Sequence, residues 1–164
     1  MLMIVGLAQN LSAAEIQPLT NLQQLASDAQ SKRLPILLVI SQHHCPFCIK
    51  LREEILNPMV LSGDYNERII MAELLMDADD NVTNLDGKSV YPGNIAAKYN
   101  VWVTPTLVFI DHQGVEVARR MLGVNTIEMY GYYLDESIDE AFKAVKKGPP
   151  YAYKVLPKHL NSSH

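Results

Sequence analysis

The sequence predicts an α/β fold in which a central mixed sheet is flanked by helices on both faces. Apolar runs of strand length alternate with segments whose apolar residues recur every three or four positions, the spacing of one helix face. Residues 36–40 form a continuous apolar run, which is typical of a strand buried on both faces. In chain order, the pattern is helix, strand, helix, three strands and a helix.

Four elements are expected in the first half of the chain: a helix over residues 20–31, a strand over 36–40, a helix from Pro46 and a strand over 69–76. Thr20 is the expected cap of the first helix. Pro46 suits the first position of the second helix, where the missing N–H of proline costs nothing. Asn57-Pro58 is expected to end that helix, because a residue before proline avoids the helical conformation.

The second half is expected to contain a hairpin and a long helix. Strands over residues 101–110 and 114–121 are joined by Asp-His-Gln-Gly, which is a turn signal. Apolar residues then recur at helical spacing over 127–145, and Asn125 with Glu128 has the spacing of a capping box.

A long polar segment, residues 77–94, precedes a helix-like stretch at 95–99. Its aspartates are of a type that binds calcium, but the required spacing that ends in a glutamate is absent. The segment is therefore predicted to be a solvated insertion.

The chain of 164 residues has the length of one domain, expected over residues 15–148, with a loose tail at 149–164. Residues 1–14 are predicted to be a signal peptide, because an apolar stretch ends in the small residues Ser12-Ala13-Ala14. A short packed helix or strand is the alternative, since the stretch lacks an initial Lys or Arg. The signal peptide predicts a periplasmic protein; the alternative is a cytoplasmic one.

The composition excludes several classes of function. The net charge is −4 without a basic cluster, so nucleic acid is not an expected partner. The two cysteines, Cys45 and Cys48, are three positions apart, whereas a disulfide-stapled scaffold spreads its cysteines along the chain. Ile49 replaces the His of a c-type haem site, and structural zinc would need a second cysteine pair. A copper or zinc site from His43, His44 and both thiols stays open as an alternative.

The cysteine pair suits thiol–disulfide chemistry that needs no further cofactor. A cysteine just before a helix lies near unpaired N–H groups and the positive end of the helix dipole, which lowers its pKa below the free value of about 8.5. Cys45 is therefore the predicted attacking thiol. Cys48 lies almost one turn later, and it is predicted to be buried and to resolve the mixed disulfide.

Two sequence blocks resemble the signatures of the thioredoxin superfamily. Residues 37–48, LLVISQHHCPFC, resemble its first strand and active-site turn. Residues 99–109, YNVWVTPTLVF, resemble its second signature, and the resemblance implies that Pro105 is cis and faces the cysteines. It also implies a thioredoxin fold over residues about 20–147. Residues 53–59 and 130–133 are further similar to exported bacterial members of the SoxW and DsbD C-terminal-domain type.

Departures from the family pattern identify a further candidate residue. Val39 stands where thioredoxins carry a buried acid, and Glu73 stands in the triplet where they carry a lysine. Alternation along the strand places Glu73 on an apolar face. Glu73 is accordingly a candidate proton acceptor for Cys48, and a glutamate at a strand edge is the alternative.

Five residues are expected to bind the substrate: His44, Pro46, Phe47, Thr104 and Pro105. His44 replaces the tryptophan that often precedes the first cysteine; it either stabilises the Cys45 thiolate when protonated or contacts substrate. Thr104 would present its backbone to an extended substrate strand. Trp102 is expected to pack inside the domain, with a place beside the binding groove as the alternative.

The resemblance implies a thiol–disulfide oxidoreductase that reduces disulfides in protein or peptide substrates and is itself kept reduced by a membrane thiol carrier. Exported members with threonine before the proline usually act as reductases. A disulfide oxidase or isomerase is the first alternative, and a copper-binding protein on the same fold is the second. Isomerases usually dimerise through an added domain that has no counterpart here, so a monomer is expected.

Overall fold

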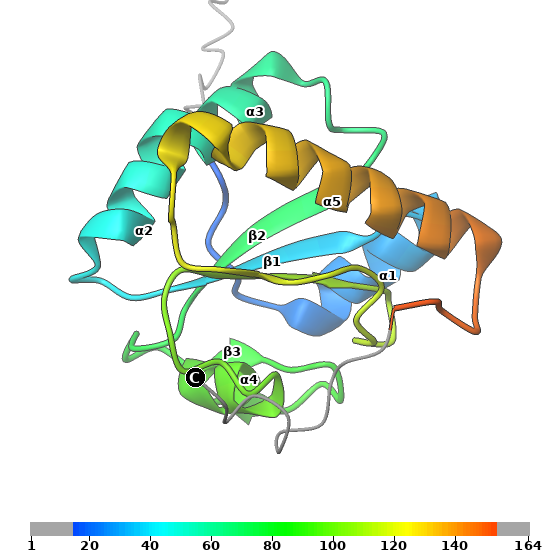
Figure 1. Cartoon of the computed structure of the whole chain (residues 1–164). Coiled ribbons are helices and arrows are strands. Elements are labelled where there is room, and N and C mark those ends of the chain that lie inside the picture. The colour runs from blue at the N-terminus through cyan, green and yellow to red at the C-terminus, as the bar shows by residue number, and fades with distance from the viewer. Residues whose placement is uncertain (1–14, 154–164) are drawn as a thin grey trace, which may run out of the picture.

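A four-stranded sheet lies at the centre of the domain (Figure 1). The computed structural model describes residues 15–153; the predicted signal peptide and residues 154–164 of the predicted tail lie outside them. The strands lie in the order β2 (Ile70–Leu75), β1 (Ile36–Ser41), β5 (Thr106–Ile110) and β6 (Met121–Leu122). β1 is parallel to β2 and antiparallel to β5, and β5 is antiparallel to β6, so the predicted mixed sheet is confirmed.

Helices cover both faces of the sheet, as predicted. On one face lie α1 (Leu22–Lys32) and α4 (Pro92–Lys98). The opposite face is covered by α2 (Pro46–Leu51), η1 (Arg52–Leu56), α3 (Asn57–Ser62) and α5 (Ile127–Lys147). Among residues 15–153, none of the helices, even the 21-residue α5, combines the length and the apolar character needed to cross a membrane.

The position of β1 between two layers of helices explains why its sequence is apolar without alternation. All six of its residues are buried. Ile36, Leu38 and Ile40 pack in the core beneath α1 and α4, whereas Leu37 and Val39 pack in the core beneath α2 and α5. Since side chains of a strand alternate between faces, a strand with a hydrophobic core on each side must be apolar throughout.

The outer edge of β2 is covered by residues that precede the first helix. Glu73 N–H donates to the Gln17 carbonyl at 2.9 Å, and Leu19 N–H donates to the Glu73 carbonyl at 2.7 Å. The backbone of β2 is thereby bonded on both sides, by β1 and by residues 17–19. No pattern in the sequence predicts this pairing.

The polar segment 77–94 is exposed or half-buried at all positions but Val82 and Pro92, and it contains a small antiparallel hairpin of β3 (Val82–Thr83) and β4 (Ser89–Val90) that was not predicted. Val82 is buried in the core beneath α1 and α4. The Asn84 side-chain oxygen accepts the N–H groups of Asp86 and Lys88, each at 2.9 Å, which closes the turn. The burial of Val82 and the turn at Asn84 together fold the segment onto the domain.

The active-site helix does not end at Asn57-Pro58. It continues through a π-helical turn, η1, in which Asn57 N–H donates to the Arg52 carbonyl, and then through α3. Pro58 lies at the start of α3, and Asn57 before it keeps helical dihedral angles, so the proline does not end the helix here.

Both predicted helix caps were wrong. Asn21, and not Thr20, caps α1, and its side-chain oxygen accepts Gln24 N–H at 2.9 Å. At α5 the capping residue is Thr126, and its side chain makes no capping hydrogen bond. The packed face of α5, and not its cap, therefore sets where this helix lies.

The predicted hairpin forms around Asp111, but its strands are shorter than expected. The Asp111 carboxylate accepts the N–H groups of Gln113 and Val115, and Gly114 adopts a positive φ of 79°. The first strand begins only at Thr106, after a cis proline. The second returns through one bridge at Glu116 and then pairs as β6.

The described part of the C-terminal tail is attached to the domain. Tyr151 Oη donates to Asp111 Oδ2 at 2.7 Å, and its ring packs against the core beneath α5. Burial raises the pKa of Tyr151, and the Asp111 carboxylate adds to this. The expectation of a loose tail is therefore wrong for Tyr151, while residues 154–164 lie outside the described part.

Candidate active site

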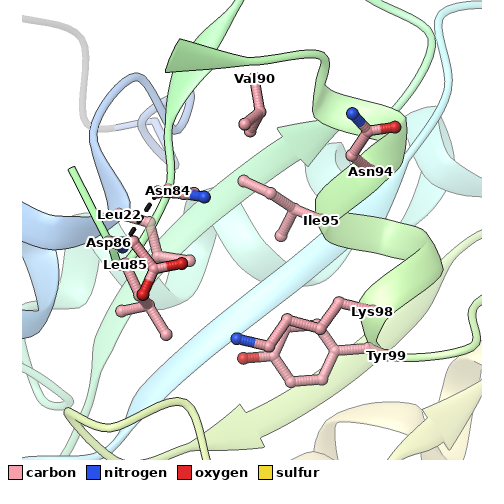
Figure 2. Close-up of a pocket in the computed structure, with 9 residues that line it drawn as sticks. All are labelled: Leu22, Asn84, Leu85, Asp86, Val90, Asn94, Ile95, Lys98 and Tyr99. Atoms are coloured by element: carbon pink, nitrogen blue, oxygen red, sulfur yellow. Dashed lines mark hydrogen bonds between the residues drawn. The ribbon is translucent and has the colours of Figure 1, made fainter. Parts of the chain in front are cut away.

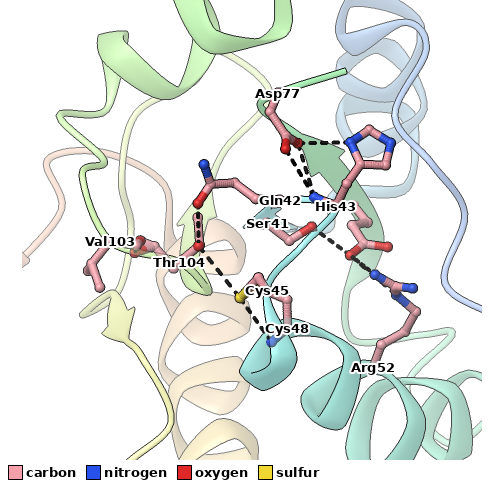
Figure 3. Close-up of a disulfide and its surroundings, with 11 residues drawn as sticks. Ser41, Gln42, His43, Cys45, Cys48, Arg52, Asp77, Val103 and Thr104 are labelled. Carbon is pink, nitrogen blue, oxygen red and sulfur yellow. Dashed lines mark hydrogen bonds and ion pairs between the residues drawn. A yellow bond between two sulfur atoms is a disulfide. The ribbon is translucent and has the colours of Figure 1, made fainter. Parts of the chain in front are cut away.

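The two cysteines lie where β1 passes into α2, and they form a disulfide (Figure 3). Cys45 is the N-cap of α2 in an extended conformation, and Pro46 occupies the first turn of the helix. Cys45 Sγ accepts the N–H of Cys48 at 3.2 Å. The sulfur thus satisfies one of the free N–H groups at the start of the helix, as the sequence analysis expected of an activated thiol.

The two cysteine residues differ in exposure, and Cys48 is the more buried, as predicted. Cys45 is 8% exposed and Cys48 2%. Cys45 is itself buried, because the loop before β5 lies against it: Thr104 Oγ1 is 3.6 Å from Cys45 Sγ. An attacking role for Cys45 and a resolving role for Cys48 agree with this order.

The proline of the second signature has the predicted geometry. The Thr104–Pro105 peptide bond is cis. Thr104 contacts Cys45, so the cis-proline loop faces the cysteines although about sixty positions separate the two in sequence. Thr104 Oγ1 also donates to Gln42 Oε1 at 2.9 Å, a partner that the sequence did not indicate (Figure 3).

Glu73 lies on β2 and points to the face that α2 covers. Its carboxylate is 7% exposed and accepts the Ser41 hydroxyl at 2.6 Å. Arg52, at the start of η1, donates to the same oxygen from Nη2 at 3.0 Å and from Nε at 3.3 Å. Glu73 thus lies on an edge strand of the sheet, as in the alternative, but its side chain is buried and paired.

Arg52 and Ser41 are site residues that the sequence analysis missed. Arg52 comes four residues after Cys48, so it lies on the same helix face as the buried sulfur. That spacing was an available signal. Ser41 directly follows the apolar run of β1 and is fully buried. Its position gave no comparable signal.

The histidines before Cys45 have different surroundings. His43 donates its backbone N–H to the Asp77 carboxylate at 3.1 and 3.2 Å, and its ring nitrogen lies 3.0 Å from Asp77 Oδ1. Burial opposes ionisation of Asp77, but these hydrogen bonds outweigh it and hold the pKa of Asp77 below its usual value. His44 is exposed, and its ring makes no hydrogen bond within residues 15–153.

Two aromatic side chains are exposed in the segments that carry the cysteines and the cis proline. Phe47, which lies between the cysteines, is 59% exposed, and Trp102 is 81% exposed. The expectation that Trp102 packs inside the domain was wrong. Its position three residues before Pro105 agrees with the alternative, a place beside the binding groove.

Among residues 15–153, no group of three or more His, Cys, Asp and Glu side chains is arranged to hold a metal ion. In this disulfide state, three of the four groups of the alternative copper site have other partners, and the fourth, His44, is exposed. His43 is paired with Asp77, and the two sulfurs are bonded to each other.

A small cavity of about 90 Å³ lies on the opposite face of the sheet, away from α2 (Figure 2). Leu22, Leu85, Val90 and Ile95 form its apolar lining. The polar side chain of Asn84 at its rim is already bonded to its own turn. The cavity contributes nothing to the cysteine site.

Comparison with solved structures places the fold among known redox proteins. A structure described as a DsbH oxidoreductase has a TM-score of 0.57 at 20% identity, over 87% of this chain and 95% of that one. Thioredoxin from Fasciola hepatica has a TM-score of 0.53 at 22% identity, over 77% of this chain and 99% of its own. Thioredoxin O2 from Arabidopsis thaliana, in its oxidised state, has a TM-score of 0.51 at 18% identity, over 79% and 96%.

At these identities, the structural similarity shows the fold alone. No curated protein sequence matches the chain. The closer resemblance to the SoxW and DsbD type stays a prediction, since none of these relatives bears on it. The fold and the Cys45–Cys48 disulfide together support thiol–disulfide exchange in general, without a direction.

The sequence itself matches the model of a thioredoxin-like domain over residues 22–138, from the first turn of α1 into α5. This span contains both cysteines, Glu73 and the cis proline. The chain therefore belongs to the thioredoxin-like domain family.

Proposed function

We propose that this protein reduces disulfides in protein or peptide substrates by dithiol–disulfide exchange. The observation that carries the proposal is the place of Cys45 Sγ, which caps α2 and accepts the N–H of Cys48 at 3.2 Å. A thiolate at this position is stabilised by the helix terminus and faces the cis-proline loop.

The reaction would run in two exchanges. The Cys45 thiolate attacks one sulfur of the substrate disulfide, forms a mixed disulfide and releases the other substrate sulfur as a thiolate, which takes up a proton. Cys48 then loses its proton and attacks Cys45 Sγ, which releases the second substrate sulfur. Two electrons pass to the substrate, and the protein ends in the Cys45–Cys48 disulfide.

The proton of Cys48 needs an acceptor, and we propose Glu73. It is a buried carboxylate on the face covered by α2, and the Ser41 hydroxyl and Arg52 bind it. Position 39, where thioredoxins carry the acid, is Val39 on β1, and it lies directly across from Glu73 in the sheet. The acid would thus have moved to the neighbouring strand while staying at the same level of the sheet.

We further propose that substrates bind along the segments that carry the two signatures. Thr104 would present its backbone to an extended chain. Phe47 and Trp102 offer exposed aromatic surface of the kind that binds apolar side chains. His44 and Pro46 are both exposed next to the sulfurs and would complete the binding surface.

We also propose that the reaction runs in the reducing direction, in the periplasm and with a membrane partner. Reduction of substrates requires a donor that restores both thiols, and the proposed donor is a membrane thiol-transfer protein that serves the periplasm. The protein would act as a monomer. The cysteine pair is the only redox group that the proposed reaction uses.

The test is reduction of insulin by the protein with dithiothreitol, followed by equilibration of the cysteine pair with glutathione. The proposal expects insulin reduction well above that by dithiothreitol alone, and a potential more reducing than that of the glutathione couple. A pair more oxidising than glutathione would instead indicate a disulfide oxidase. Absence of insulin reduction by the wild-type chain would count against the proposed function.

A further inference from the structure

The hydroxyl of Thr104 has one proton and two acceptors within reach. Gln42 Oε1 lies 2.9 Å from Thr104 Oγ1, and Cys45 Sγ lies 3.6 Å from it (Figure 3). A hydroxyl donates a single hydrogen bond at a time. Gln42 and Cys45 therefore compete for this proton.

The outcome of the competition depends on the redox state. In the disulfide, the sulfur is a neutral and weak acceptor, so the amide oxygen of Gln42 holds the proton, which agrees with the shorter distance. In the reduced protein, the Cys45 thiolate carries a full charge. Hydrogen bonds to charged acceptors are roughly twice as strong as those between neutral groups, so the thiolate draws the proton toward itself.

We propose that Gln42 is a positioning residue that withholds the Thr104 proton from the Cys45 thiolate and thereby limits how stable this thiolate becomes. The inference rests on the proposed function in that it takes Cys45 as the attacking thiol. A less stable thiolate leaves a pair that gives up its electrons more readily. Gln42 would thus favour the reducing direction.

The surroundings of Gln42 fix it in this role. The residue before it, Ser41, is the last residue of β1, and its hydroxyl binds Glu73. The residue after it, His43, is held by its backbone N–H and its ring to Asp77. With both neighbours tied to side chains of β2 and the loop after it, the half-buried Gln42 side chain is held against Thr104.

The competition predicts opposite signs for two substitutions. Gln42→Leu removes the competing acceptor, so the full hydrogen bond goes to the thiolate, and we expect the pKa of Cys45 to fall by about half a unit, or threefold in acid strength. Thr104→Val removes the donor, and we expect the pKa to rise by about one unit, or tenfold. In the Thr104→Val background, Gln42→Leu should leave the pKa of Cys45 unchanged, because the hydroxyl proton that Gln42 would accept is no longer there.

The experiment measures iodoacetamide alkylation against pH in a Cys48→Ser chain, where Cys45 is the only thiol left. Wild-type, Gln42→Leu, Thr104→Val and double variants form a double-mutant cycle, and Gln30→Leu on the exposed face of α1 is the matched control. Gln42→Met, which keeps the chain length and offers only a weak acceptor, replaces the leucine variant if that one fails to fold.

The expected result is a lower pKa in Gln42→Leu that disappears in the double variant. A higher pKa in Gln42→Leu would mean that the amide donates to Thr104, and this would overturn the inference. An equal effect with and without the Thr104 hydroxyl would overturn it as well. Insulin reduction by the same wild-type protein reports on the proposed function separately, since alkylation needs no substrate.

Discussion

Arg52 and Glu73 form an ion pair beneath the active-site helix, with Arg52 Nη2 3.0 Å from Glu73 Oε1. Both side chains are largely removed from solvent, the carboxylate more than the guanidinium. Removing Arg52 would leave the Glu73 carboxylate buried without its cation, at a cost of about 3–5 kcal/mol. The pair connects η1, which follows α2, to β2.

Replacing Glu73 with Gln should slow resolution of the mixed disulfide while leaving the first attack by Cys45 unchanged. The amide keeps the shape of the side chain but is a far weaker base than the carboxylate. General base catalysis is worth about 10²–10⁴-fold, so we expect a loss of at least about tenfold. Single-turnover kinetics with a fluorescent peptide disulfide separates the two steps.

Glu53→Gln, which makes the same change at an exposed site in η1, is the matched control for that experiment. Equal rates of resolution in wild-type and Glu73→Gln proteins would exclude Glu73 as the proton acceptor. The variant should also unfold at lower urea concentration, because Arg52 loses its buried partner.

The two cysteines should behave differently when each is replaced alone. Cys48→Ser removes the resolving thiol, so it should trap substrates as stable mixed disulfides through Cys45, whereas Cys45→Ser should trap almost none. The helix terminus acts on the sulfur that caps it, which is Cys45. Non-reducing electrophoresis after incubation with a disulfide peptide counts the trapped species; similar yields from both variants would contradict the asymmetry.

Trp102→Ala should weaken substrate binding without weakening the fold. The side chain is 81% exposed, and exposed substitutions usually change the free energy of unfolding by less than about 0.5 kcal/mol. We expect KM for a protein disulfide to rise severalfold while kcat changes little. Leu61→Ala, which removes an exposed apolar side chain on α3, is the control. If both variants match wild type, Trp102 has no part in substrate binding.

Asp77→Asn should remove a pH-dependent part of the stability. Hydrogen bonds from His43 hold the pKa of Asp77 below its ordinary 3.8 in the folded chain. The ionised group therefore stabilises the fold above that value, and the stabilisation is lost as the pH falls through the lowered pKa. The difference in urea midpoint between wild type and variant should shrink as the pH falls below about 4. A difference that grows on acidification would contradict this.

The sequence was sufficient for β1 and for the start of the active-site helix. The apolar run 36–40 predicted a strand between two cores, and Cys45 before Pro46 indicated a helix N-terminus. Side-chain pairs across the fold could not be predicted in the same way. Arg52 meets Glu73 across 21 positions and Thr104 meets Gln42 across 62, and both pairs depend on strand register and helix phase that no local pattern records.

The departures from the family pattern were informative for a physical reason. A valine at position 39 removed a buried acid, and a chemistry that needs a proton acceptor then draws attention to another acid on a neighbouring strand. Glu73 was identified in this way, and its inward orientation was confirmed. Arg52, which pairs with Glu73, was missed because in the sequence it looks like one more charged residue of an exposed helix face.

The π-turn η1 determines which way the side chains of the following helix, α3, point around the helix axis. Because Asn57 N–H bonds to the Arg52 carbonyl, these two residues stand one above the other along the helix. Arg52 reaches Glu73 on β2, and Asn57 Oδ1 accepts the N–H of Ile16 at 3.1 Å, just before the segment that pairs with β2. The side chains of Arg52 and Asn57 thus hold two neighbouring chain segments, β2 and the stretch before it that begins at Ile16, to the same helix. If the same five residues were wound as an α-helix, Asn57 would lie about 140° around the axis from Arg52, and the two side chains could not reach both segments at once.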